Sequence, residues 1–280
     1  DFFLSWSAQT NYGFGDIGLR FYPPLAHYLL AFTQIFTNDW QTTSWINILF
    51  WMLVGSIGIY FFARHWLSPQ NALLVGMLYA FAPYHLSQIY QYFLYSEFAA
   101  AGILPFCFLF VTKVNCEGKV QNVLLLGFFS GLLILTHIPT TIIGTICLSL
   151  YSIIILDWKN KEKVIPRFIF SGLIALLLTS FYWIKLITEM NWVNHIDQKF
   201  SAAGYYNYKS AFFPFFSTVN ELYFVKQMWF RDIVGILTYL LLVPIFIYLI
   251  TSIIKPKTPK KRISEFFLPL HFWRLLCPRT

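Results

Sequence analysis

Residues 11–37 read NYGFGDIGLRFYPPLAHYLLAFTQIFT, and this stretch joins a polar, glycine-containing loop to a short apolar segment. The two glycines on either side of Phe14 allow backbone angles that other residues resist. Pro23 keeps Tyr22 in an extended conformation, and Pro24 suits the first turn of a helix, where its missing N–H costs nothing. We therefore predict a bendable polar loop followed directly by a helix.

The composition of the whole chain places this loop next to a membrane. Hydrophobic residues make up 58% of the sequence and charged residues 11%. A soluble domain carries about 25% charged residues. Tryptophan and tyrosine gather near the ends of the apolar runs, as they do at membrane interfaces. The composition predicts an all-α, polytopic transmembrane protein.

Seven apolar runs approach the length of about 20 residues that a membrane-crossing helix needs. They are residues 44–63, 71–88, 97–112, 120–136, 138–156, 168–187 and 233–254. The second run is interrupted at Pro83. Residues 24–37 are too few to span the membrane, and the segment is too polar because it contains His27 and Gln34. We predict about seven spans plus an interfacial helix in the first outer loop.

Charge sets the expected orientation and the domain boundaries. The net charge is +8, and the positive residues lie in short loops between spans and in one tail. The positive-inside rule explains this distribution better than nucleic-acid binding does, and it puts those loops in the cytoplasm. We expect an extracytoplasmic loop over residues 1–43, a transmembrane domain over residues 44–254 with an outer loop at 188–231, and a basic cytoplasmic linker and truncated segment over residues 255–280. Since the chain starts without Met inside an apparent loop, we also expect a fragment.

The opening loop carries the first candidate site residues. Asp16 and Arg20 flank the glycine-rich turn, so a carboxylate and a guanidinium can share one pocket. The carboxylate would accept a proton from a hydroxyl, and the guanidinium would hold a phosphate through two contacts. An ordinary loop ion pair is the competing interpretation. Tyr22, in the same loop, is a further candidate for substrate binding.

Two other candidates lie at the predicted outer ends of spans. Glu97 opens the third span, where an acid is favourable at a helix N-terminus and capping alone can account for it. His137 lies at a hairpin tip, and titratable groups at membrane depth or at its interface suggest function. Hydrogen bonding from Thr136, Thr140 and Thr141 is the structural alternative for this histidine. Both residues are candidate catalytic groups beside Asp16.

Lys185 is the last candidate, as an anchor for a substrate phosphate. Glu189 follows it by four residues, so a helical ion pair or snorkelling to the interface also explains it. The four cysteines show no metal-ligand or disulfide spacing, and no nucleotide-binding or hydrolase motif is present. The sequence indicates no cofactor and leaves a divalent metal open.

The order of several short motifs resembles a known family. NYGFGDIGLRFYPPLAHYLLAF, YQYFLYSEFAAAGILPFCFLF and LLILTHIPTTI are similar to segments of GT-C membrane glycosyltransferases. They most resemble the bacterial membrane proteins called 6-pyruvoyl-tetrahydropterin synthase-related. The resemblance covers about the first 150 residues and implies no pterin chemistry.

What the resemblance implies is transfer of a sugar from a polyprenyl-phosphate donor on the extracytoplasmic face of the bacterial inner membrane. Its partners would be that lipid-linked sugar and membrane lipid. The superfamily's aspartate early in the first outer loop has no counterpart here, since Asp1 lies too close to the Tyr-Pro-Pro element, so its role stays unassigned. A non-enzymatic lipid or polysaccharide transporter is the alternative function, and whether the chain is an enzyme stays open.

Overall fold

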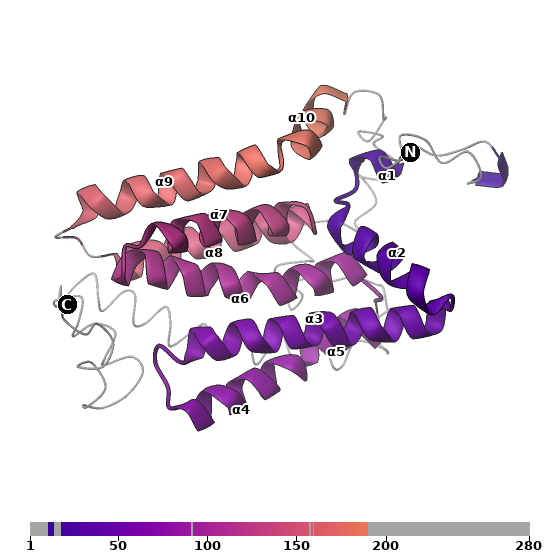
Figure 1. The fold of residues 1–280 in the computed structure, drawn as a ribbon, viewed down its shortest axis with the longest axis horizontal. Helices are drawn as coiled ribbons and strands as arrows, with labels where there is room; N and C mark the ends of the chain where they lie inside the picture. Colours follow the sequence, from indigo (N-terminus) through magenta and orange to yellow (C-terminus); the bar gives the residue numbers. More distant parts are fainter. Residues whose placement is uncertain (1–10, 14–17, 91, 157, 159, 190–280) are drawn as a thin grey trace, which may run out of the picture. The chain divides into compact units, whose positions relative to one another are not determined.

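The computed structural model describes residues 11–13, 18–90, 92–156, 158 and 160–189 (Figure 1). Asp16, the outer loop at 188–231 beyond Glu189, the predicted span at 233–254 and the basic tail lie outside these residues. Backbone contacts divide the chain into two compact units, residues 1–184 with 257–280 and residues 185–256. The account below concerns the first unit, because only residues 185–189 of the second are described.

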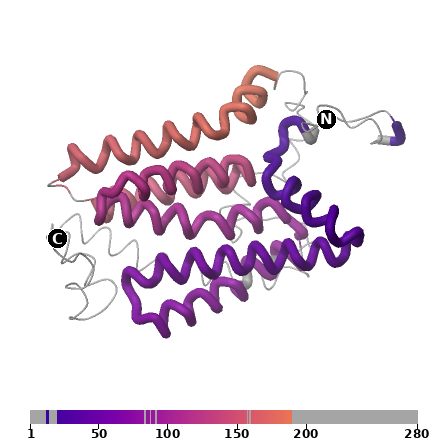
Figure 2. The backbone as a smooth tube through the Cα atoms, viewed as in Figure 1, coloured from indigo at the N-terminus to yellow at the C-terminus, as the bar shows by residue number. Residues whose placement is uncertain are grey.

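Every described element is a helix, in agreement with the predicted all-α class. The elements are η1 (Asn11–Gly13), α1 (Gly18–Phe21), α2 (Leu25–Thr37), α3 (Trp40–Ala63), α4 (Pro69–Ala80), α5 (Pro83–Tyr90), α6 (Tyr95–Cys116), α7 (Val120–Ile134), α8 (Ile138–Ile155), α9 (Lys161–Leu178) and α10 (Ser180–Glu189). The backbone trace in Figure 2 follows the same order.

Four of the described helical segments are long and apolar enough to cross a membrane: Trp40–Ala63, Pro69–Tyr90, Tyr95–Cys116 and Ile138–Ile155. The count rises to 5 if α9 and α10 together form one span. The integral membrane class is thus supported, whereas seven spans are not confirmed. Val120–Ile134 is a shorter apolar helix than the predicted span at 120–136, and Leu25–Thr37 is confirmed as a helix without evidence that it lies in an interface.

One predicted span differs clearly from the structure. The sequence predicts a span over residues 168–187, whereas α9 begins at Lys161 and α10 leaves it at an angle of 71° after Leu178, so the two helices form either one broken span or two separate helices. The hydroxyl of Thr179 donates to the carbonyl of Ala175 at 2.8 Å. Such a bond back to the preceding turn competes with the backbone ladder and bends helices.

The turn between α2 and α3 is specified by its own residues. Asn38 ends α2 in the left-handed conformation at φ 51°, and its N–H donates to the Gln34 carbonyl at 3.0 Å. Asp39 then accepts the Thr42 N–H at 2.7 Å and caps α3. This cap satisfies one of the free donors at the start of the helix. The short helix α2 is therefore joined to α3 by a turn with defined geometry.

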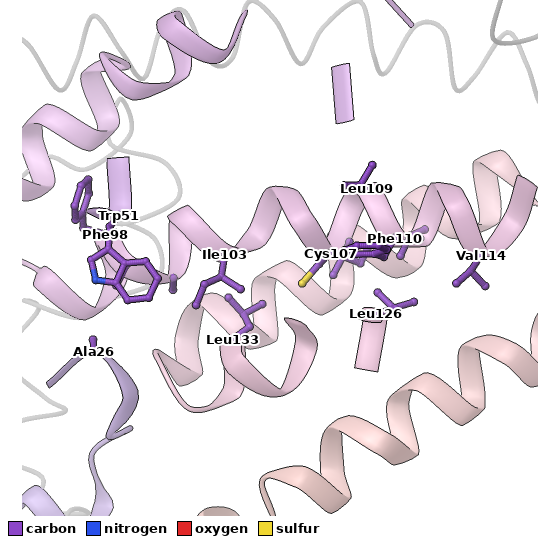
Figure 3. Close-up of a cluster of buried hydrophobic side chains, with 14 of the residues drawn as sticks. Ala26, Trp51, Phe98, Ile103, Cys107, Leu109, Phe110, Val114, Leu126 and Leu133 are labelled. Carbon is purple, nitrogen blue, oxygen red and sulfur yellow. The ribbon is translucent and has the colours of Figure 1, made fainter. Parts of the chain in front are cut away.

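Helix α6 is the centre of the packing, because it contacts α3, α7 and α8. In the most apolar 18-residue stretch of α6, 72% of the residues are buried, against 6% in the corresponding stretch of α8. Its buried side chains join those of neighbouring helices in one apolar core, where Ile103 lies beside Leu133 (Figure 3). A helix that is apolar on all sides is expected in such a central position.

Small residues let α3 approach α6 closely. A Cβ on Gly102 would lie 2.9 Å from the Trp51 carbonyl oxygen, and a Cβ on Gly58 would lie 2.8 Å from the Phe106 ring. Without a hydrophobic force between helices in lipid, such close backbone approach supplies much of the attraction. The glycines of this pair are therefore packing residues.

The contacts along α3 and α6 show that the two helices run in the same direction. Trp51 lies near Tyr95 at one end, whereas Phe62 lies near Phe108 towards the other. Arg167 packs against Gly118, just beyond the C-terminal end of α6. The bundle consequently separates Glu97 from a set of basic residues at the opposite end: Arg64, Lys113, Lys119 and Arg167.

Two glycines on facing helices give a test of this packing. A Cβ on Gly127 of α7 would meet the Ser171 carbonyl oxygen at 2.8 Å, whereas a Cβ on Gly172 of α9 would meet nothing within 4 Å. We expect Gly127→Ala to destabilise the detergent-solubilised protein by roughly 1–3 kcal/mol through overpacking. Gly172→Ala should leave stability unchanged or raise it slightly, since Ala favours helices. Thermal unfolding followed by tryptophan fluorescence measures both, and equal effects would contradict the α7–α9 packing.

Candidate functional site

Glu97 lies in the first turn of α6 and is the centre of a polar cluster. The hydroxyl of Tyr84 donates to its Oε1 at 2.5 Å, and Nε2 of Gln88 donates to the same oxygen at 3.1 Å. The carboxylate is half-buried and also faces the positive end of the helix dipole. The prediction that Glu97 opens a helix is confirmed, and its contacts go beyond capping.

Helix α5 supplies both donors to Glu97 (Tyr84 and Gln88), because it begins at Pro83. Pro83 is its first residue, and proline is well tolerated at that position. Tyr84 and Gln88 are four residues apart, so they share one face of the helix. The Leu94 N–H donates to the Gln88 carbonyl at 3.0 Å and helps turn the chain from α5 into α6. This tight turn brings the donor face of α5 against the start of α6.

The first turn of α6 also receives the opening segment of α2. Nε2 of His27 lies 3.3 Å from the Ser96 hydroxyl. The Tyr22 ring packs edge-on against the His27 ring, with centroids 5.2 Å apart. The predicted substrate-binding residue Tyr22 therefore contacts His27, which in turn contacts Ser96, the residue before Glu97.

A backbone bond ties the start of α2 to the loop between α7 and α8. The Leu25 N–H donates to the Leu135 carbonyl at 2.9 Å. Two residues after Leu135, His137 caps α8: its Nδ1 lies 2.7 Å from the Thr140 hydroxyl and accepts the Thr140 N–H at 3.4 Å. The expected threonine partner of His137 is thus confirmed for Thr140.

His137 is also coupled electrostatically to Glu97. Burial lowers the pKa of His137 below its ordinary value, while the negative charge of Glu97 acts in the opposite direction. His137 is therefore mostly neutral near pH 7, and Nδ1, which accepts the Thr140 N–H, is its acceptor nitrogen. We call Glu97, Tyr84, Gln88, Ser96, His27 and His137 the α6 N-terminal cluster.

A second polar chain supports this cluster from α3. Nε1 of Trp51 donates to the Tyr95 hydroxyl at 3.2 Å, and that hydroxyl donates to Oδ1 of Asn47 at 3.2 Å. Asn47 is buried and donates in turn to the Thr43 carbonyl at 2.9 Å. This chain fixes Tyr95, and with it the first turn of α6.

The predicted site residues fall into three groups. Glu97, His137 and Tyr22 come together at one end of the bundle, around the N-terminus of α6. Arg20 is half-buried in α1, whose Phe21 carbonyl accepts the Tyr182 hydroxyl at 2.9 Å. The structure gives no test for Asp16, which it does not describe, or for the Lys185–Glu189 pair, which stays a prediction.

Sequence reasoning missed the contributions of α5 to this site. Tyr84, His85 and Gln88 lie in YHLSQIY, at the end of an otherwise apolar run. A histidine and an amide at membrane depth are a recognisable signal, because polar groups there are costly unless they have a function or a partner. Within the described part of the chain, no three His, Cys, Asp or Glu side chains are grouped to hold a metal ion.

The coupling between the two ends of this cluster can be measured. We expect Glu97→Gln to lower the pKa of His137 further, since the substitution removes the charge that favours the imidazolium. NMR titration of protein labelled at histidine would report the shift. Glu117→Gln, at the far end of α6, is the matched control and should leave the His137 titration in place. An unchanged His137 pKa in Glu97→Gln would contradict the proximity of the two groups.

Comparison with known proteins gives a family but no individual relative. No curated protein and no solved structure matches the chain. A family model described as "6-pyruvoyl-tetrahydropterin synthase related domain; membrane protein" matches residues 19–256, which include the whole α6 N-terminal cluster. The match confirms the family resemblance seen in the sequence and does not show membership of the GT-C superfamily. Because it covers most of the sequence, the chain belongs to the 6-pyruvoyl-tetrahydropterin synthase-related family of membrane proteins.

Proposed function

We propose that this chain is part of a GT-C-type membrane glycosyltransferase that transfers a sugar from a polyprenyl-phosphate donor. One observation carries the proposal. At one end of the helical bundle, a half-buried carboxylate, Glu97, lies close enough to a largely neutral histidine, His137, to act on it electrostatically. Pairs of titratable groups in unlike environments are typical of acid–base sites. The motif resemblance to GT-C enzymes supports the same assignment.

The proposed chemistry is displacement at the anomeric carbon of the donor sugar. The oxygen of an acceptor hydroxyl forms the new bond, and the bond from the anomeric carbon to the phosphate oxygen breaks, with its electron pair leaving on the lipid phosphate. The hydroxyl proton passes to Glu97 as general base, either directly or through His137. Asp16 is the alternative base in the opening loop.

Cationic groups would stabilise the departing phosphate. Arg20 is proposed for this role because its guanidinium can contact two phosphate oxygens at once. Tyr22, which packs on His27, would line the path between Arg20 and the α6 N-terminal cluster. Lys185 is a second proposed phosphate contact.

The proposed setting is a bacterial inner membrane, with the cluster on the extracytoplasmic side. Support comes from the distribution of charge, because the described basic residues Arg64, Lys113, Lys119 and Arg167 lie at the end of the bundle away from Glu97. Basic loops favour the cytoplasm. About seven spans and an interfacial α2 complete the proposed topology.

A transporter of lipid or polysaccharide is the second candidate, favoured by the 71° bend between α9 and α10. Transporters commonly use broken helices of this kind at their substrate sites. The two candidates differ in whether a covalent bond in the lipid-linked sugar is broken.

Transfer of radiolabelled sugar from polyprenyl-phosphate donors, in membranes containing the full-length protein, tests the enzyme proposal. We expect Glu97→Gln to reduce kcat about 10²–10⁴-fold, as loss of a general base does. Arg20→Ala should also reduce transfer. Glu117→Gln makes the same chemical change at the opposite end of α6, where Lys119 pairs with the carboxylate at 3.2 Å, and should retain wild-type transfer.

Each outcome points to one interpretation. Full transfer by Glu97→Gln at normal expression would reject Glu97 as the base and direct attention to Asp16. Wild-type membranes that transfer no sugar from any donor, but move labelled lipid between leaflets of reconstituted vesicles, would replace the enzyme by the transporter.

A further inference from the structure

Two buried polar atoms at the edge of the α6 N-terminal cluster have no hydrogen-bond partner in the part of the chain that the structure describes. They are Nδ1 of His85 and Oε1 of Gln88. The residues are only 5% and 6% exposed. Buried polar groups in folded proteins are nearly always paired, because an unpaired one keeps the full cost of losing water. Both atoms therefore call for a hydrogen-bond partner that the described residues do not supply.

The two atoms belong to one place. His85 and Gln88 are three residues apart on α5, so they lie on the same side of that helix. Gln88 donates to Glu97 at 3.1 Å, and the His85 ring packs edge-on against Phe98, with centroids 5.9 Å apart. Glu97 and Phe98 are consecutive in α6. Both unpaired atoms thus lie where α5 meets the first turn of α6.

The hydrogen-bonding character of this place is that of an acceptor site. Nδ1 of the His85 ring has no partner among the described residues and can act as an acceptor when the ring is neutral. Oε1 of Gln88 is an acceptor by nature. Oε1 of Glu97 already receives two donors, and Oε2 accepts none from the described residues. An occupant with several hydroxyl groups can pair with all three groups, because a hydroxyl both donates and accepts hydrogen bonds.

Aromatic rings complete the surroundings. The His85 ring lies 4.5 Å from that of Tyr79 and 5.5 Å from that of Tyr84, measured between centroids, in addition to its contact with Phe98. A site with acceptors at its edge and aromatic surfaces beside them suits a molecule with hydroxyl groups on its rim and C–H groups on its faces. Sugars have this distribution, and binding sites commonly combine such apolar walls with a few placed polar atoms.

We propose that His85 Nδ1, Gln88 Oε1 and the Glu97 carboxylate bind the hydroxyl groups of the sugar carried by the lipid-linked donor. This assignment rests on the proposed glycosyltransferase function and names where its sugar is held. His85 and Gln88 act as specificity residues, whereas Glu97 also reaches the reacting hydroxyl. The lipid phosphate is bound elsewhere in this proposal, by Arg20 of the opening loop.

Binding of two probes to the full-length protein in lipid nanodiscs separates the sugar contact from the lipid contact. The probes are polyprenyl phosphates carrying glucose, mannose or arabinose, and bare polyprenyl phosphate. His85→Phe keeps an aromatic ring against Tyr79, Tyr84 and Phe98 but removes Nδ1, and Gln88→Leu removes Oε1. We expect each variant to bind the best sugar-bearing probe about tenfold more weakly, the loss typical of one hydrogen bond. Affinity for bare polyprenyl phosphate should stay at the wild-type value.

The same contact can be tested from the ligand's side in the wild-type protein. Donors lacking one sugar hydroxyl at a time should bind more weakly at one or two positions. That loss should disappear in His85→Phe or Gln88→Leu, because the partner atom is already gone. The control is His65→Phe, which makes the same substitution just after the C-terminal end of α3, away from the first turn of α6. This variant should match the wild type with every probe.

The possible results are distinct. Unchanged affinity of both variants for sugar-bearing probes, while the wild type transfers sugar, would overturn the inference and leave water as the occupant, with the proposed function intact. Equal weakening for bare and sugar-bearing lipid would also overturn it, since the variants would then act on the fold. Wild-type protein that neither binds nor transfers would instead reject the proposed function itself, and the sugar site with it.

Discussion

The close packing of α6 against its neighbours is the constraint on which the rest of the structure depends. Gly102 brings the backbones of α3 and α6 together, and a Cβ there would press on the Trp51 carbonyl at 2.9 Å. Lipid tails are as apolar as leucine side chains, so helices in a membrane associate through shape and hydrogen bonds. The small residues of α6 thus hold one helix at the centre, and Glu97, His137 and Tyr22 lie around its first turn.

That first turn is a demanding environment for a carboxylate. Glu97 is stabilised there by Tyr84, Gln88 and the positive end of the helix dipole, and the two hydrogen bonds require α5 to lie against α6. Leaving a buried atom of His85 and one of Gln88 without a hydrogen bond among the described residues costs folding free energy. Proteins accept such departures mainly at sites that bind or react, because selection otherwise removes them. The unpaired polar atoms and the proposed site therefore lie at the same place.

Part of this site could be predicted from single residues. Glu97 at a helix start and His137 beside Thr140 follow from capping preferences, which act over one helical turn. The contacts of His27 with Ser96 and of Leu25 with Leu135 join segments far apart in sequence, and no local preference specifies them. The bend after Leu178 in the predicted span at 168–187 could not be foreseen for a related reason, since hydropathy reports how apolar a run is and not whether a threonine bends it.

By itself, the sequence determined that the chain is an all-helical membrane protein, where most helices lie, that Pro83 interrupts one of them, and which loops are basic. These features depend on hydropathy, proline geometry and charge, which are properties of neighbouring residues. Only the tertiary structure decided that α6 is central, that α5 turns its polar face to Glu97, and that buried polar atoms of His85 and Gln88 have no hydrogen-bond partner among the described residues. Those outcomes depend on which helix faces meet, and that choice is made by packing between surfaces distant in the chain.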